Sequence, residues 1–155
     1  MISARQLASE IKLAINEASE DLQEAGIKIT SFDLSLKVIV GKTAGIDASA
    51  SIGPIKVGAS KNSSEEKTTS MNITFIPKEL DTELQGSMAE ELSKLIVEMA
   101  KEIQAVSYEY PEFGYSKSFI ELYFVITEKG DIKMLFEYNE ESQWVHSIKV
   151  YFSSN

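Results

Sequence analysis

The sequence predicts an α+β fold made of two successive units, each a helix followed by antiparallel strands. Hydrophobic residues recur every three or four positions in residues 3–25 and again in residues 80–107, which is typical of amphipathic helices. After each segment the hydrophobic spacing changes to two, as expected for strands with one buried face. We therefore expect the element order α-β-β-β(-β)-α-β-β-β, with the helices packed on an antiparallel sheet.

The chain length predicts a single compact domain, 1–155. A chain of 155 residues has the size of one ordinary domain and can bury a substantial hydrophobic core. Within it, the pattern separates residues 1–78, a helix plus long strands, from residues 79–155, a long helix plus a three-stranded meander. The two halves share no residue-level identity, so the repeat is one of architecture.

The first helix is predicted by its ends as well as by its apolar face. Ser3 and Gln6 form a capping-box pattern at its start, and Gly26 follows it as a stop signal. Acidic residues occupy the opposite side, so the helix is amphipathic and lies on another part of the fold. Its apolar positions are Leu7, Ile11, Ala14, Ile15, Ala18, Leu22 and Ala25.

The strands of the first half follow from alternation of apolar and polar residues. The even-numbered positions from 32 to 40 are apolar and predict a half-buried strand. Residues 46–52 alternate Ile and Ala with polar residues, and this small-residue face predicts a close approach of the first helix. The other expected elements are a bend at Gly53-Pro54, a strand continuation at 55–59, an exposed polar loop at 60–67 and a returning strand at 71–75.

The second half is predicted as one long helix and three strands. The helix has an apolar stripe formed by Leu84, Met88, Leu92, Leu95, Met99, Ile103 and Val106. Ser87 and Glu90 form a second capping-box pattern inside it. Residues 119–127 are apolar on both faces, which predicts a central strand. The remaining elements are a turn at 128–131, a return strand at 132–138, a polar loop at 139–143 and a last strand at 144–152.

Charge and composition disfavour several classes of partner. With 24 acidic and 15 basic residues the net charge is −9, which opposes binding to nucleic acid and to anionic membranes. The chain contains no cysteine, which excludes disulfides and cysteine-based zinc sites and fits a reducing compartment. The first residues of the chain contain charges at Arg5, Glu10 and Lys12, so this stretch does not form the uninterrupted apolar run of a targeting segment. We therefore expect a cytoplasmic protein.

Two motifs contain residue types that can carry chemistry. Gly41-Lys42-Thr43 matches the end of a phosphate-binding loop, but Leu36 stands where that loop needs a glycine, so the pattern favours a turn after a strand. His146, the single histidine, shares strand parity with Trp144 and Ile148. This parity predicts a partly buried, hydrogen-bonded position rather than a catalytic one.

Paired carboxylates do not predict a site either. The pairs Glu65-Glu66, Glu90-Glu91 and Glu140-Glu141 fall in expected loops or on a helix surface, where charge is usually solvated. No spacing matches a calcium-binding loop with its central glycine. We therefore predict no catalytic, cofactor-binding or metal-binding residues and no cofactor.

An aromatic group around Pro111 is the most suggestive surface feature. Tyr-rich loops supply large contact area at low entropic cost, so this group is predicted as a partner-binding site. The alternative is that the rings fold back over the sheet and the long helix. The residues are Tyr108, Tyr110, Phe113 and Tyr115.

Residues 34–77 carry a family resemblance. They read LSLKVIVGKTAGIDASASIGPIKVGASKNSSEEKTTSMNITFIP: an alternating strand, a Gly-bearing turn, a small-residue strand with its Gly, a serine-rich loop and a returning strand that ends in Pro. With the first helix, about residues 1–78, this run resembles the trypsin-co-occurring domains of bacteria, especially the second type. Residues 79–155 lie outside the resemblance.

The resemblance implies a helix followed by long strands. It also implies a non-catalytic module found beside trypsin-like peptidases and other effectors in bacterial conflict or defence systems, with a role in recognition or regulation. It implies no active-site residue.

Three functional hypotheses from different classes follow. The first is a non-catalytic protein-binding or regulatory module that acts with a trypsin-like protease or another effector in bacterial antiviral defence. The second is a small-ligand sensor or a hydrolase with a cleft near His146. The third is a structural homo-oligomer built through the apolar stripe at 84–106 or through an open sheet edge. We expect a protein partner, and neither nucleic acid nor a membrane.

Overall fold

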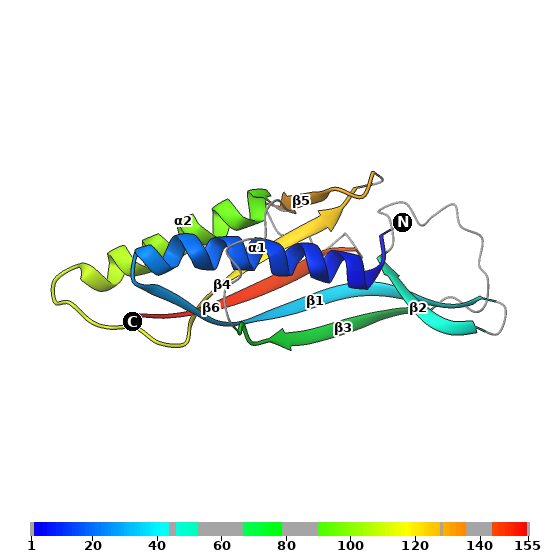
Figure 1. Ribbon diagram of the computed structural model, residues 1–155, viewed down its shortest axis with the longest axis horizontal. Helices are drawn as coiled ribbons and strands as arrows, with labels where there is room; N and C mark the ends of the chain where they lie inside the picture. Colours follow the sequence, from blue (N-terminus) through cyan, green and yellow to red (C-terminus); the bar gives the residue numbers. More distant parts are fainter. Residues whose placement is uncertain are drawn as a thin grey trace.

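The computed structural model of the protein describes residues 2–43, 46–52, 67–78, 90–127, 129–135 and 144–154. In these residues two helices lie on one face of a six-stranded antiparallel sheet, which confirms the predicted α+β fold (Figure 1). The elements are α1 (Ala4–Glu24), β1 (Ile27–Thr43), β2 (Ile46–Ile52), β3 (Lys67–Phe75), α2 (Glu90–Tyr108), β4 (Ser118–Ile126), β5 (Ile132–Leu135) and β6 (His146–Ser154).

The long strand β1 joins the two predicted units into one sheet. Its residues 32–35 pair with β3 on one edge and with β6 on the other, and its last residues pair with β2. In the second unit β4 pairs with both β5 and β6. The sheet order is therefore β2-β1-β6-β4-β5, with β3 on the opposite edge of β1. In each unit the first strand lies between the two that follow it, which departs from the chain order of a simple meander.

The strand β1 begins earlier than the alternation at 32–40 indicates. Its register with β6 shifts between Ile29 and Ser31. Ile27 and Ile29 are buried before this irregularity and Phe32 after it, so the buried positions change from odd to even. A bulge of this kind reverses which face each residue takes, and strict alternation cannot detect the strand on both sides of it.

The helix α1 agrees with its prediction at both ends. Ser3 Oγ accepts the backbone N–H of Gln6 at 3.1 Å, and Gly26 after the helix has φ +77°. The segment before the helix is tied to β2, because the backbone N–H of Ile52 donates to the carbonyl of Ile2 at 2.9 Å. The start of α1 therefore lies against the small-residue strand, as predicted. Its buried residues are Ala4, Leu7, Ile11, Ala14, Ile15, Ala18 and Leu22.

The helix α2 buries a face that is shifted around the helix from the predicted stripe, of which Leu92 is buried and Leu95 and Ile103 pack against the core. Met99 and Val106 belong to that stripe but are 43% and 71% exposed. The helix contacts α1 as well as β4 and β6. Packing against these three elements sets its buried face, and this face is not centred on the most regular hydrophobic spacing. The buried residues of α2 are Leu92, Ser93, Ile96 and Ala100.

The remaining predictions divide into those that the structure describes and those outside it. β2 covers residues 46–52 as predicted, and β3 begins at Lys67, which the sequence placed in the polar loop. The turn before β5 is present, since the N–H of Gly130 donates to the carbonyl of Thr127 at 2.9 Å. The predictions for 53–66, 79–89 and 136–143, the Ser87 cap among them, lie outside the described residues. No helix in the described part of the chain is long and apolar enough to cross a membrane.

Candidate functional site

The predicted aromatic residues lie at the end of the molecule where α2 turns back into β4 (Figure 1). Main-chain hydrogen bonds hold this connection on both sides. The N–H of Phe113 donates to the carbonyl of Ser107 at 3.0 Å, and the N–H of Ser154 donates to the carbonyl of Tyr115 at 2.9 Å. The hydroxyl of Ser154 donates to the same carbonyl at 3.1 Å. The loop is therefore anchored to both α2 and β6.

Solvent reaches most of the aromatic surface at this end. Tyr110 is 97% exposed, Phe113 70% and Tyr108 60%. Together with Val106 on the last part of α2, these residues form a surface that we call the aromatic end. Tyr115 differs, since it is partly buried and packs against the core. Only one of the four predicted rings therefore folds back over the sheet and helices.

A pocket of about 470 Å³ opens beneath the aromatic end. It is bounded by residues from α2, from the loop, from the end of β6 and from the turn that follows α1. We call it the helix-end pocket, because the C-terminal ends of both helices border it. Its lining residues are Gly26, Gln104, Ser107, Tyr108, Glu112, Phe113, Gly114, Tyr115 and Ser154.

Polar groups shape the wall of the helix-end pocket. Gln104 Nε2 donates to the carbonyl of Ala25 at 2.6 Å and to the hydroxyl of Tyr108 at 3.3 Å, which connects the end of α1 to the end of α2. Burial, and to a lesser degree the neighbouring Tyr108, raises the pKa of Tyr115, so this phenol stays neutral at physiological pH. Its buried hydroxyl oxygen has no hydrogen-bond partner among the described residues.

The sequence identified three of these lining residues and missed the others. Tyr108, Phe113 and Tyr115 belong to the predicted aromatic group. Gln104 lies one helical turn before Tyr108, so helical spacing was a signal that could have found it. Gly26 and Ser154 come from distant parts of the chain, and no local pattern connects them to the loop. Tyr110, the fourth predicted residue, does not line the pocket.

His146 lies in the core at the start of β6. It is 1% exposed, and its ring is 5.3 Å from that of Phe124. Its Nδ1 accepts the backbone N–H of Lys37 at 3.0 Å, just beyond the last residue of β1 that pairs with β6. Among the described residues, Nε2 has no hydrogen-bond partner. The histidine therefore completes the sheet at a gap in its ladder, and this arrangement does not support the hydrolase alternative.

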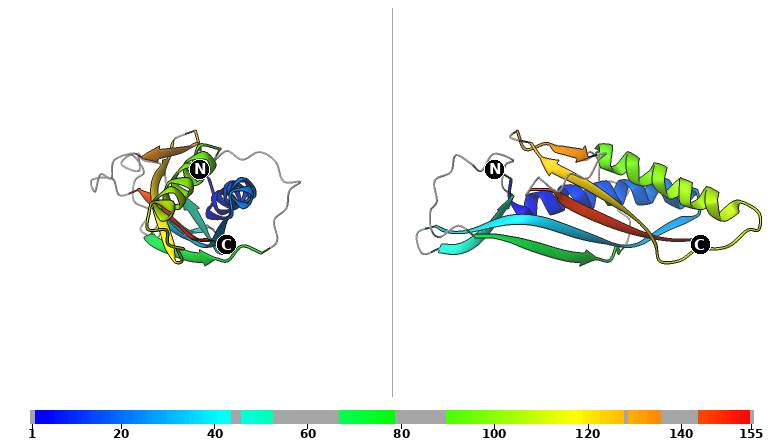
Figure 2. Two further views of the ribbon diagram at one scale, coloured as in Figure 1. Left: turned by 90° about the vertical axis from the view of Figure 1, so that its left-hand side faces the viewer. Right: turned by 180° about the vertical axis from the view of Figure 1, so that it is seen from behind.

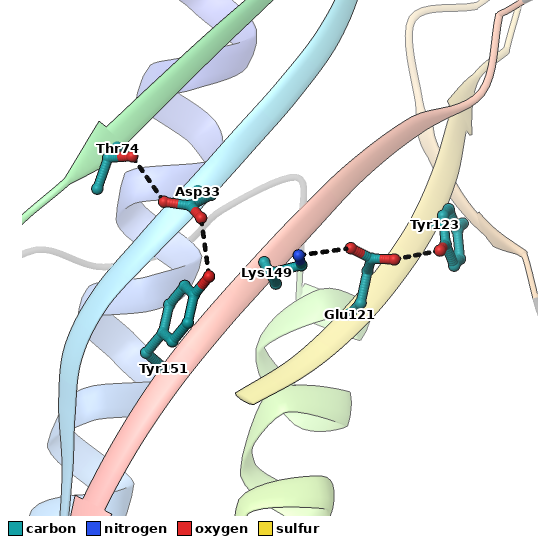
Figure 3. A network of polar contacts seen from close by, with 6 residues as sticks. All are labelled: Asp33, Thr74, Glu121, Tyr123, Lys149 and Tyr151. Carbon is teal, nitrogen blue, oxygen red and sulfur yellow. Dashed lines mark hydrogen bonds and ion pairs between the residues drawn. The ribbon is translucent and has the colours of Figure 1, made fainter. Parts of the chain in front are cut away.

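The sheet face opposite the helices carries a polar network, drawn in Figure 3. The hydroxyls of Thr74 and Tyr151 donate to the two carboxylate oxygens of Asp33, at 2.7 and 3.0 Å. Lys149 Nζ lies 3.5 Å from Oε2 of Glu121, and the hydroxyl of Tyr123 donates to the other carboxylate oxygen, Oε1. The hydrogen bond to Asp33 is the main cause that raises the pKa of Tyr151. These groups satisfy one another across four strands, so the network holds the sheet together and leaves no converging set of free acids.

The other motifs also take structural positions. Residues 41–43, tested as a phosphate-binding loop, continue β1, where Gly41 pairs with Ser49 and Thr43 with Ile46. They therefore form neither a phosphate-binding loop nor the turn after a strand that the sequence pattern favoured. Glu90 and Glu91 are exposed in the first turn of α2, where their negative charge interacts favourably with the positive end of the helix dipole. The described residues contain no cluster of three potential metal ligands.

Comparison of the chain with protein-family models, with curated proteins and with solved structures found no match.

Proposed function

We propose that the chain is a non-catalytic protein-binding or regulatory module, and that the aromatic end contacts its partner. The exposure of Tyr110 and Phe113 on an anchored loop, and of Tyr108 at the end of α2, is the observation that carries this proposal. Large aromatic side chains exposed together on a soluble protein are typical of interaction surfaces, where they supply most of the binding energy. Because the loop is fixed on both sides, little conformational entropy is lost when a partner binds.

The identity of the partner is proposed from the sequence resemblance. Residues 1–78 resemble the trypsin-co-occurring domains, and α1 followed by long antiparallel strands is the arrangement which that resemblance implies. We therefore propose a trypsin-like protease or another effector of a bacterial defence system as the partner. The acidic, cysteine-free composition fits an action in the cytoplasm.

Affinity purification tests the proposed function. The tagged full-length chain is expressed in its native host, and the retained protein is quantified against the variant Tyr110→Ser. We expect the variant to retain about tenfold less partner, because truncation of a central aromatic contact costs about 1.4 kcal/mol or more. Ile76→Ser is the matched control, since Ile76 is also a large exposed hydrophobic residue, at 75%, outside the aromatic end. Equal retention by the two variants would contradict the proposal.

The sheet edge favours a second candidate function, a homo-oligomer. In the described residues β3 pairs only with β1, over nine consecutive residue pairs without a bulge. Residues 68–75 on this edge contain no charged residue and no proline, the usual barriers to pairing with another strand. The apolar stripe is a poorer route, because Leu92 and other residues of α2 are buried within the chain.

A further inference from the structure

The electrostatics of the helix-end pocket indicate which kind of ligand it accepts. The two helices run in the same direction, so their C-terminal ends meet at this end of the molecule (Figures 1 and 2). The C-terminus of a helix carries a partial negative charge, which a Lys, Arg or His in the last turn usually offsets. Neither helix has a basic residue in its last turn. Two helix C-termini without a basic residue in their last turn therefore flank the pocket.

The lining adds to this negative potential. Glu112 is the one charged residue among those that line the pocket, and it is acidic. Lys28 and Lys117 are near in the chain but do not belong to the lining. An anionic or purely apolar ligand would find no complementary charge in such a pocket.

The aromatic rings of the lining are suited to the same kind of ligand. On the sheet, Phe75 and Phe119 each have a lysine of this chain over the ring, with Nζ 5.0 and 4.9 Å from the centroid. Within the described residues, no Lys or Arg lies over Tyr108, Phe113 or Tyr115. A lining that combines aromatic rings with an acidic residue is suited to ammonium and guanidinium groups, which are attracted to the faces of aromatic rings.

We propose that the helix-end pocket receives the cationic side chain of a lysine or arginine that a protein partner presents. The inference rests on the proposed function for the source of this side chain. The exposed rings of the aromatic end would contact the partner around the inserted residue, and the pocket would select partners that carry a basic residue at the contact. The chain's own net charge of −9 would assist the approach of such a basic surface.

A titration of the isotopically labelled full-length chain tests the pocket, with NMR detection at Gly114 and Tyr115. The probes are the N-acetyl, N-methylamide derivatives of lysine, arginine and norleucine, the last as the uncharged analogue of lysine. We expect the lysine and arginine probes to shift these resonances saturably, with dissociation constants of about 1–10 mM, and norleucine to leave them in place. Equal shifts with norleucine, or no shift with any probe, would overturn the inference.

Two variants and one further probe identify the cause of binding. Glu112→Gln removes the charge with little change of shape and is expected to weaken the lysine probe about fivefold, as the loss of one solvated charge at contact distance predicts. Glu98→Gln removes an exposed acid of α2 outside the lining and is expected to leave binding unchanged. A pocket that binds tetramethylammonium but neither amino-acid probe would select free quaternary ammonium compounds, and this would overturn the assignment to a partner's side chain.

The inference and the proposed function fail in distinguishable ways. Tyr110 does not line the pocket, so Tyr110→Ser tests the aromatic end without altering the cation site. If Tyr110→Ser loses the partner while the pocket ignores lysine and arginine, the proposed function stands and the inference is wrong. If the pocket binds both cations but Tyr110→Ser retains the partner as well as Ile76→Ser does, the inference stands and the aromatic end is not the contact surface.

Discussion

His146 shows how one residue can complete a backbone ladder. The pairing between β1 and β6 extends to Ser35, and β2 takes over from Val38 on the same edge of β1. The N–H of Lys37 lies between these two pairings, and His146 Nδ1 accepts it. A buried backbone N–H without a partner costs about 1–3 kcal/mol, so the imidazole replaces a missing strand neighbour. This role requires the neutral ring, since Nδ1 of an imidazolium carries a proton and cannot accept.

The same contact predicts a pH-dependent stability. Burial, and secondly the charge of Lys37, lowers the pKa of His146 from its ordinary 6.5 to about 4. Between these values the unfolded chain binds a proton that the folded chain does not, so the free energy of unfolding falls as the pH is lowered from about 6.5 towards 4. The free energy of unfolding falls by about 3 kcal/mol in total over this interval, and this contribution is fully present above pH 6.5.

Urea unfolding between these pH values measures this effect. His146→Gln is the comparison, because a glutamine carbonyl can still accept the N–H of Lys37 but does not titrate. We expect the difference in unfolding free energy between wild type and variant to change by about 3 kcal/mol across the interval. If the variant is too unstable to analyse, NMR titration of the imidazole itself gives its pKa. A value near 6.5 in the folded protein would contradict the prediction.

At the residue scale, the alternation of apolar and polar residues predicted which side chains are buried better than it predicted their hydrogen-bond partners. The parity of His146 with Trp144 and Ile148 indicated a partly buried, hydrogen-bonded histidine, and the structure buries all three residues more completely than that, with His146 1% exposed. The partner of His146 is a backbone N–H 109 positions away in the chain, and no residue pattern can indicate such a contact. The aromatic loop is similar, since its composition indicated a surface but Gly26 and Ser154, which complete the pocket, carry no local signal.

At the scale of elements, one side chain links the ends of the two helices. Gln104 Nε2 donates to the carbonyl of Ala25, the cap residue of α1, at 2.6 Å. This carbonyl is part-buried, and its hydrogen bond joins α2 to the turn between α1 and β1. Removal of the donor would leave the carbonyl without this partner.

Gln104→Met tests the link, because methionine keeps the length of the side chain and lacks the donor. We expect the free energy of unfolding to fall by about 1 kcal/mol, the usual contribution of one hydrogen bond of this kind. Lys101→Met is the control at an exposed position of the same helix, with an expected change within about 0.5 kcal/mol. Chemical denaturation measures both variants. An equal effect of the two substitutions would show that the contact with Ala25 contributes nothing specific.

The predicted elements succeeded where local chemistry determines them. α1 has both a capping residue and a stop glycine, and its bounds agree with the sequence pattern. β1 and α2 differ from their predictions because of tertiary contacts: a bulge reverses the parity of β1 after Ile29, and contact with α1 turns the buried face of α2 away from Met99. The pairing of β1 with β6, which unites the two halves, joins residues too far apart in the chain for any local pattern to predict.

At the scale of the whole molecule, the described sheet has one face covered by helices and edge strands of unequal length. The helices cover one face, and the network around Asp33 and Glu121 occupies the other. Within the described residues three strands pair with one other strand only: the four-residue β5, the seven-residue β2, which is also bridged to the segment before α1, and the nine-residue β3. A short edge strand rarely pairs with a strand of another molecule, whereas a long, regular edge strand pairs with one readily. β3 is therefore the edge at which two copies of the chain would pair.

Self-association through β3 is the last prediction. Two copies related by a two-fold axis at Met71 would place Ser70 opposite Asn72, so polar residues meet polar residues next to the axis. The charge of −9 on each copy opposes this contact, so we expect the dimer to strengthen as salt screens the repulsion. Sedimentation equilibrium at increasing protein and salt concentrations measures the association constant of the dimer.

Two variants test whether the dimer forms through β3. Asn72→Lys puts two like charges next to the axis and should shift the equilibrium to monomer. Gln23→Lys makes the same charge change at an exposed position of α1 and should not. A monomeric mass under all these conditions would leave β3 as an edge that its surroundings already protect, and would remove the homo-oligomer as a function.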